Sequence, residues 1–194
     1  MLKIKHIEDI QIDLISDYLR IPSVNKKEDE KRILKLKKNI FDGKLPDKAG
    51  PVAEAIVEIF YKKLRKNYIS NPRPQFYTNK LEEKIELRPD GFLTESHKKF
   101  WVEVKMRRYK SQGTANEKIT NVVRKYKSLT EQTGNKLILF FIADDEHKFN
   151  REWAKLCRGE IKPSDEIDRK WLEADTAVLE KIIYGTEIAN VLDS

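Results

Sequence analysis

The run of apolar residues from Leu137 to Ala143 constrains the fold of this chain more than any other stretch. It contains no polar side chain, so it lacks the alternation of a strand that has one face in water. A continuous run of this kind is typical of an inner strand that is covered on both faces of a sheet. The run is also far too short to cross a bilayer. We therefore expect a layered protein in which helices cover a central sheet.

Segments with helical or strand periodicity flank this run. Helices are predicted at 7–20, 26–41, 50–66, 115–131 and 147–158, with a helical tail from about residue 164. Strands are predicted at 75–81, 84–94, 99–108 and 136–143, with turns at Gly91 and around Ser96. The helix at 115–131 would join the last two strands as a right-handed βαβ unit. This order predicts an α/β (α+β) fold: a mixed central sheet flanked by helices, with helical additions at the N- and C-terminal ends.

Composition excludes several classes of protein. Cys157 is the only cysteine, which excludes an internal disulfide and a multi-cysteine zinc site, and it fits a reducing, cytoplasmic setting. The first residues mix charged with apolar side chains and show no signal-peptide core. We expect no membrane segment. No glycine-rich phosphate-binding loop is present, so we also expect no nucleotide cofactor.

The net charge of +7 is concentrated in one segment. Residues 98–127 contain ten lysines and arginines, against only Glu103 and Glu117. A local excess of positive charge is what a nucleic-acid partner requires. A solvated, lysine-rich surface would account for the same charge, so the charge alone leaves both explanations open.

The predicted strand at 99–108 combines an apolar face with a charged face. Side chains alternate along a strand. One face therefore carries Phe100, Val102, Val104 and Met106, and the other carries Trp101, Glu103, Lys105 and Arg107. The first face is expected to join the core. If the strand at 84–94 pairs with this strand as a hairpin, Asp90 comes close to Glu103.

Two carboxylates that converge on one point repel each other unless a cation lies between them. Mg²⁺ suits such a place because it prefers oxygen ligands, and the Val104 carbonyl could add one more oxygen to those of Asp90 and Glu103. Lys105 beside the ion could hold an attacking water and take its proton. These are the parts that hydrolysis of a phosphodiester requires.

The residues Pro89-Asp90, a spacer of twelve residues and Glu103-Val104-Lys105 together resemble the motif of the PD-(D/E)xK nuclease superfamily. The resemblance covers roughly residues 50 to 143. It implies a restriction-endonuclease-like fold and metal-dependent cleavage of nucleic acid. In that scheme Asp90 and Glu103 bind the metal ion and Lys105 is catalytic.

The resemblance also implies an acidic residue on the helix before the sheet, and Glu54 is the candidate for this further metal ligand. Glu58 fits less well because Lys62 is its ordinary i+4 partner. Glu54 has a structural explanation as well, since the helix dipole favours a carboxylate in the first turn.

The other candidates have ordinary explanations too. Asp90 followed by Gly91 is a common turn signal. Glu103 and Lys105 could lie on the solvated face of an edge strand, although Trp101 on the same face argues against a fully wet surface.

Residues that follow the charged strand are candidates for contact with DNA. Basic side chains are expected to contact phosphates and polar ones to contact base edges. The phosphate candidates are Arg107, Arg108 and Lys110, and the base candidates are Ser111 and Gln112. Lys118 and Lys125 join this set from a polar stripe on the next helix. Thr114 and Glu117 match a capping box at the start of that helix, in a segment that resembles those of some type II restriction endonucleases.

The residues and the resemblance together predict a Mg²⁺-dependent endonuclease that cuts double-stranded DNA, with Mn²⁺ as a substitute ion. The chain resembles a sequence-specific type II restriction enzyme, which implies a homodimer. We expect residues 1–194 to form one nuclease domain, with an N-terminal helical region (1–48), a catalytic core (49–145) and a C-terminal helical region (146–194). Two alternatives stay open. One is a structure-specific nuclease, such as a Holliday-junction resolvase or a DNA repair enzyme, and the other is a non-catalytic DNA-binding accessory protein.

Overall fold

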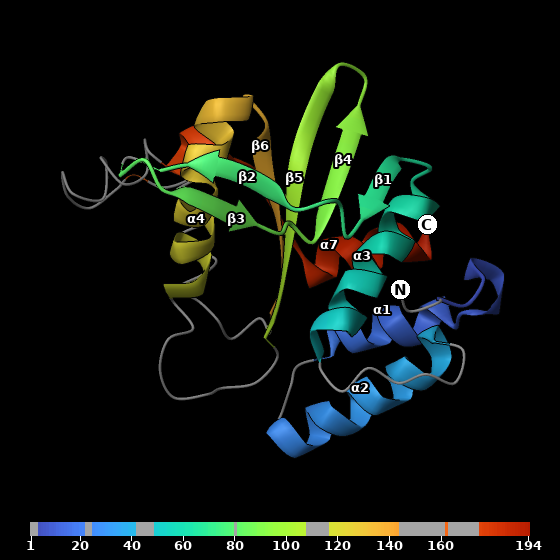
Figure 1. Cartoon of the computed structure of the whole chain (residues 1–194). Coiled ribbons are helices and arrows are strands. Elements are labelled where there is room, and N and C mark those ends of the chain that lie inside the picture. Colours follow the sequence, from blue (N-terminus) through green and yellow to red (C-terminus); the bar gives the residue numbers. More distant parts are fainter. Residues whose placement is uncertain are drawn as a thin grey trace.

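The apolar run forms strand β6 (Lys136–Ala143), and the sheet is built around it (Figure 1). β6 pairs in parallel with β5 (Lys98–Arg107) on one side and with β7 (Leu179–Tyr184) on the other. Every side chain from Leu137 to Ile142 is buried, as a strand covered on both faces requires. The computed structural model describes residues 4–21, 25–41, 49–79, 81–107, 117–143, 162 and 175–194, with the backbone alone at 107, 117–120 and 143.

The other half of the sheet is antiparallel. β4 (Gly91–Glu95) pairs with β5, and β1 (Asn67–Ser70) pairs with β4. The five strands therefore have the order β1-β4-β5-β6-β7. A separate antiparallel pair, β2 (Gln75–Thr78) and β3 (Lys84–Leu87), is inserted between β1 and β4. The mixed sheet that the sequence predicts is confirmed.

Helices cover both faces of the sheet. Within the described residues they are, in chain order, the 3-10 helix η1 (Ile7–Asp9) and the α-helices α1 (Ile12–Arg20), α2 (Lys26–Ile40), α3 (Ala49–Lys63), α4 (Glu117–Thr133) and α7 (Gly185–Asp193). One apolar cluster joins α1, α2, α3 and α7 to the face of β5 that carries Val102 and Val104. A second cluster joins α4 to the opposite face, which carries Trp101. Figure 1 accordingly shows α4 apart from the other helices.

Some predicted element boundaries are wrong, and Pro89 explains the clearest case. The predicted strand at 84–94 is two strands, β3 and β4, which belong to different sheets. Proline has no N–H to donate to a ladder, so the chain leaves one sheet before Pro89 and enters the other after it. The four residues of β1 are too few for alternation to reveal them, and the predicted helix at 7–20 is divided into η1 and α1.

The helical prediction for residues 179–184 is also wrong, because a bulge in β7 imitates helical spacing. Leu137 of β6 lies opposite Leu179, but the next residue, Ile138, lies opposite Lys181. Glu180 is therefore an extra residue that shifts the alternation of β7 by one position. Buried residues then fall at 179, 182 and 183, which are the spacings of a helix face.

Other predictions fall outside the described residues. These are the helix at 147–158, the core positions of Trp153 and Trp171, and the capping box, for which Thr114 is not described and Glu117 is described by its backbone alone. Within the described ranges, no helix is both long enough and apolar enough to cross a membrane.

Asp175 is a buried acid at the start of the helical turn 175–178 that precedes β7. Its residue is 3% exposed, and its Oδ2 atom has no hydrogen-bond partner among the described residues. Burial raises the pKa of Asp175 from 3.8 to about 6, against the opposing effect of the positive charges of Arg124 and Lys127. The charged form of Asp175 is therefore less favourable in the folded protein than in the unfolded chain.

We predict that Asp175→Asn gains stability relative to the parent as the pH rises from about 4.5 to about 7.5. The folded-state pKa exceeds the ordinary value, so the folded state binds the proton more tightly than the unfolded state does. The stabilisation from protonation is full below the ordinary pKa and is lost as the pH rises through the folded pKa. The difference between the two pH values should be on the order of 2 kcal/mol.

Urea denaturation of parent and variant at both pH values measures this difference. Asp13→Asn, at an exposed position on α1, controls for the change in net charge. An Asp175→Asn effect of equal size at both pH values would contradict the prediction.

Candidate active site

Asp90 stands at the point where β4 begins, and both neighbouring strands hold it. Its backbone carbonyl accepts a hydrogen bond of 2.9 Å from the amide of Asn71, just after β1. Its carboxylate Oδ2 accepts a hydrogen bond of 2.7 Å from the amide of Val104 in β5. The β4–β5 ladder ends at the pair Gly91–Val102. Extended by one residue, the same register places Asp90 opposite Glu103.

The side chains of Asp90, Glu103 and Lys105 lie together on the sheet. Lys105 Nζ is 2.6 Å from Glu103 Oε1 and 3.9 Å from Asp90 Oδ2. It also lies 3.2 Å from the carbonyl oxygen of Val104. Three oxygens, from three of the four predicted metal ligands (Asp90, Glu103 and Val104), therefore surround a single positive charge.

Glu103 is a buried carboxylate in the middle strand of the described sheet. Its residue is 2% exposed, and Trp101 on the same face is also buried. The explanation that Glu103 lies on a solvated edge strand is therefore wrong. A charge in this position requires close partners, and α4 supplies two in addition to Lys105. Tyr126 donates a hydrogen bond to Oε2, and Lys125 Nζ lies 3.4 Å from Oε1.

Burial raises the pKa of Asp90, and the negative charge of Glu103 raises it further. The amide of Val104 and the charges of Lys105 and Lys125 oppose this rise. Removal from water and a neighbouring negative charge both disfavour a second carboxylate charge. A cation bound between Asp90 and Glu103 would therefore offset the repulsion between their two negative charges.

Glu54 lies near this cluster on α3. The helix begins at Ala49, and Glu54 is in its second turn, so the helix-dipole explanation for a first-turn carboxylate is wrong. Burial raises the pKa of Glu54; Asp90 and Glu103 raise it further, while Lys105 lowers it. Glu54 is thus within electrostatic range of Asp90, Glu103 and Lys105.

Glu54 is nevertheless not a third member of a preformed ligand cage. In the described part of the chain, no three histidine, cysteine, aspartate or glutamate side chains converge to hold a metal ion. Glu58 forms the expected surface pair with Lys62 at 2.7 Å.

The candidates for DNA contact are only partly described. Lys125 is exposed over part of its length and reaches Glu103 rather than standing free in solvent. For Arg107 and Lys118 the structure describes the backbone alone. Arg108, Lys110, Ser111 and Gln112 lie outside the described residues.

Tyr126 has a role in the site that the sequence pattern does not reveal. Its position on the apolar stripe of a helix predicts only a core residue, which it is. The available signal is chemical: a tyrosine on a buried stripe brings a hydroxyl that needs an acceptor. The pattern does not say that the acceptor is Glu103.

Gly91 is required by close packing and not by a turn. A Cβ atom at this position would overlap the hydroxyl end of Tyr68. The Tyr68 ring is stacked on that of Tyr61, with centroids 4.7 Å apart, so it has little freedom to move away. The interpretation of Asp90-Gly91 as an ordinary turn is therefore wrong; the β4–β5 turn lies at Ser96, whose φ is 52°.

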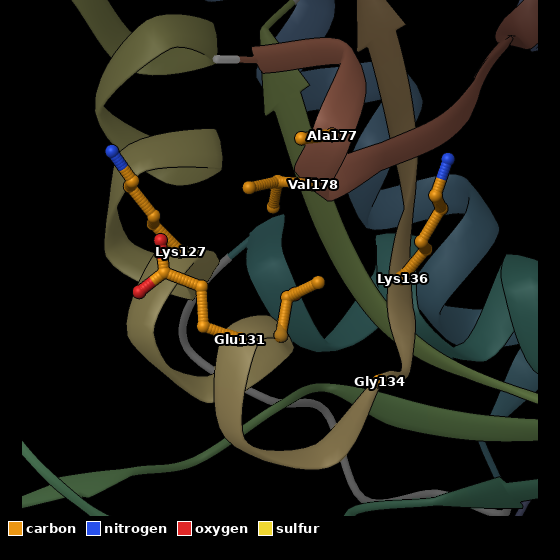
Figure 2. A pocket seen from close by; sticks show the side chains of 7 residues that line it. Lys127, Glu131, Gly134, Lys136, Ala177 and Val178 are labelled. Atoms are coloured by element: carbon orange, nitrogen blue, oxygen red, sulfur yellow. The ribbon is translucent and has the colours of Figure 1, made fainter.

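The described residues also form a cavity of about 480 Å³ away from this cluster (Figure 2). It lies between the second half of α4, the start of β6 and the turn before β7. In Figure 2, Lys127 and Lys136 stand on opposite sides of it, with Ala177 and Val178 between them. The carboxylates of the candidate site do not line this cavity.

Comparisons with protein-family models, with curated proteins and with solved structures find no match to this chain.

We predict that Gly91→Ala lowers the free energy of unfolding by about 1–3 kcal/mol, because the added methyl group forces Tyr68 out of its place. Chemical denaturation measures the loss. Gly50→Ala is the matched control: its Cβ would meet no atom closer than 4.0 Å, and alanine favours the helix there. A Gly91→Ala protein as stable as the parent would show that the packing around Tyr68 is looser than described.

Proposed function

We propose that this protein is a Mg²⁺-dependent endonuclease that hydrolyses phosphodiester bonds of double-stranded DNA on a restriction-endonuclease-like fold. The observation that carries the proposal is the convergence of three oxygens, from Asp90, Glu103 and Val104, on the ammonium group of Lys105. The cluster combines a place for a cation with a lysine that can face a water molecule.

The donor set fits a magnesium ion. Lys105 Nζ marks a position where the protein stabilises positive charge, and all three groups around it are oxygens. Mg²⁺ takes oxygen ligands and is commonly held by one or two carboxylates, with waters and phosphate completing its shell. Asp90, Glu103 and the Val104 carbonyl would hold the ion. When bound, it would neutralise charge on the phosphate and make a bound water more acidic. Mn²⁺ has the same ligand preference and would serve as a substitute.

The residues of the chain would contribute positioning. The Val104 amide fixes the direction of the Asp90 carboxylate at 2.7 Å, so this ligand is oriented before any substrate arrives. The Lys105 side chain is 33% exposed. Its ammonium can therefore turn from the carboxylates toward water and hold the nucleophile for attack on phosphorus. Lys125, at the same carboxylate, is placed to meet a negatively charged phosphate.

The architecture supports the same proposal at a coarser level. Helix α3 precedes the antiparallel strands β1, β4 and β5, and α4 leads back to the parallel strand β6. This is the order that the resemblance to PD-(D/E)xK nucleases implies. The net charge of +7 favours a polyanionic substrate. Sequence-specific cleavage by a homodimer is the finer form of the proposal and follows from the likeness to type II restriction enzymes.

We predict that the parent protein cuts plasmid DNA when Mg²⁺ is present and that a chelator stops the reaction. Lys105→Ala should lower the rate at least about 100-fold, because the group that positions the nucleophile is lost. Lys99→Ala removes an exposed lysine from the same strand outside the cluster and should leave the rate nearly unchanged.

The products separate the alternatives. Discrete fragments with a common end sequence support a restriction enzyme, and cutting confined to branched or damaged duplexes supports a resolvase or repair nuclease instead. Binding without cutting, or a Lys105→Ala protein that digests DNA as fast as the parent, would overturn the catalytic proposal.

A further inference from the structure

Tyr126 places a hydroxyl group in the interior, against the proposed metal-binding carboxylate. The residue is fully buried in the apolar cluster between α4 and the sheet. Its hydroxyl donates a hydrogen bond to Glu103 Oε2. A buried hydroxyl without an acceptor costs free energy, and the acceptor here belongs to the candidate site.

The hydrogen bond divides the two oxygens of Glu103 between different tasks. Oε2 faces the interior and is held by Tyr126. Oε1 faces Lys105 Nζ at 2.6 Å and Lys125 Nζ at 3.4 Å. The terminal torsion of a glutamate is broad, so a fixed partner on one oxygen decides which oxygen faces Lys105 and at what angle.

Other tyrosines show that this bond is not a general requirement of the fold. The hydroxyls of Tyr61 and Tyr68 are also buried, and neither has a hydrogen-bond partner among the described residues. Within the described residues, two buried tyrosine hydroxyls thus lack a protein acceptor. Tyr126 differs because its hydroxyl is aimed at a functional carboxylate.

Lys125 and Tyr126 are consecutive residues of α4 that approach opposite oxygens of Glu103. Lys125 Nζ also lies 5.7 Å from the centre of the Tyr126 ring. Tyr126 donates its hydrogen bond to Glu103 Oε2 from the apolar core. Lys125 Nζ lies instead beside Glu103 Oε1, the oxygen that a metal ion would use. The two neighbours should therefore have opposite effects on a cation: one orients the ligand, and the other competes for it.

We infer that Tyr126 is a positioning residue that orients Glu103 for a divalent metal ion. The inference rests on the proposed function of the site and extends it to α4. Partners that orient a metal ligand from outside the coordination shell typically contribute 10–100-fold to metal affinity. Tyr126→Phe removes one oxygen and retains the ring and its apolar contacts, so we expect the variant to fold.

The test is Mn²⁺ binding to the full chain, measured by isothermal titration calorimetry without DNA. We expect Tyr126→Phe to weaken binding by about 10-fold. Tyr61→Phe is the matched control, since it removes a buried hydroxyl without a partner, and it should bind Mn²⁺ as the parent does. Lys125→Met should bind Mn²⁺ as tightly as the parent or more tightly, because a competing ammonium is lost.

Binding of duplex DNA in chelator provides a second readout. It should be the same for the parent and Tyr126→Phe, because the buried hydroxyl has no access to DNA. Circular dichroism and thermal unfolding confirm the fold of each variant.

If Tyr126→Phe binds Mn²⁺ as tightly as the parent, the positioning role is wrong while the nuclease proposal stands. If Tyr126→Phe and Lys125→Met weaken binding equally, a general disturbance of α4 replaces the inference. A parent protein that binds no Mn²⁺ would overturn the inference and the proposed metal site together.

Discussion

The structure of the site depends on the stabilisation of one negative charge, that of Glu103, which is the one buried charged side chain in the described strands. An ionised carboxylate removed from water is costly unless it is paired and hydrogen-bonded. Here a strand neighbour, Lys105, and two residues of α4 share that task. The packing of α4 therefore affects the site directly. The same helix contributes apolar side chains to the core and two partners to the carboxylate of Glu103.

The remaining parts follow from how β4 meets β5. The ladder between them stops at Gly91, and the side chain of Asp90 accepts the hydrogen bond of an amide that lies beyond it. Where the β4–β5 ladder ends, a hydrogen bond to the side chain of Asp90 thus replaces a regular backbone hydrogen bond and fixes the position of this carboxylate. Tyr68, pressed against Gly91, leaves no room for a side chain there. Packing on one side and hydrogen bonding on the other leave Asp90 little freedom.

Sequence reasoning predicts the parts of this arrangement that depend on local periodicity. The alternation in β5 separates Val102 and Val104 from Glu103 and Lys105, and a short hairpin register brings Asp90 opposite Glu103. The role of Tyr126 is beyond such reasoning, because it depends on how a helix packs on a strand more than twenty residues away in the chain. β1 is too short to show a period, and Glu180 in β7 breaks the period that would have revealed a strand. Tertiary pairing decides these elements, whereas an unbroken apolar run is enough to identify β6.

The extra residue in β7 has a consequence for how copies of the chain can meet. β7 is the last strand of the described sheet, and such a strand offers unpaired backbone groups to any other extended chain. The bulge twists this border and sets two exposed charged residues, Glu180 and Lys181, side by side along it. Both features discourage continuation of the sheet into a neighbouring molecule. Self-association through a shared, extended sheet is thereby disfavoured on this side, and β1 is left as the other border of the described sheet.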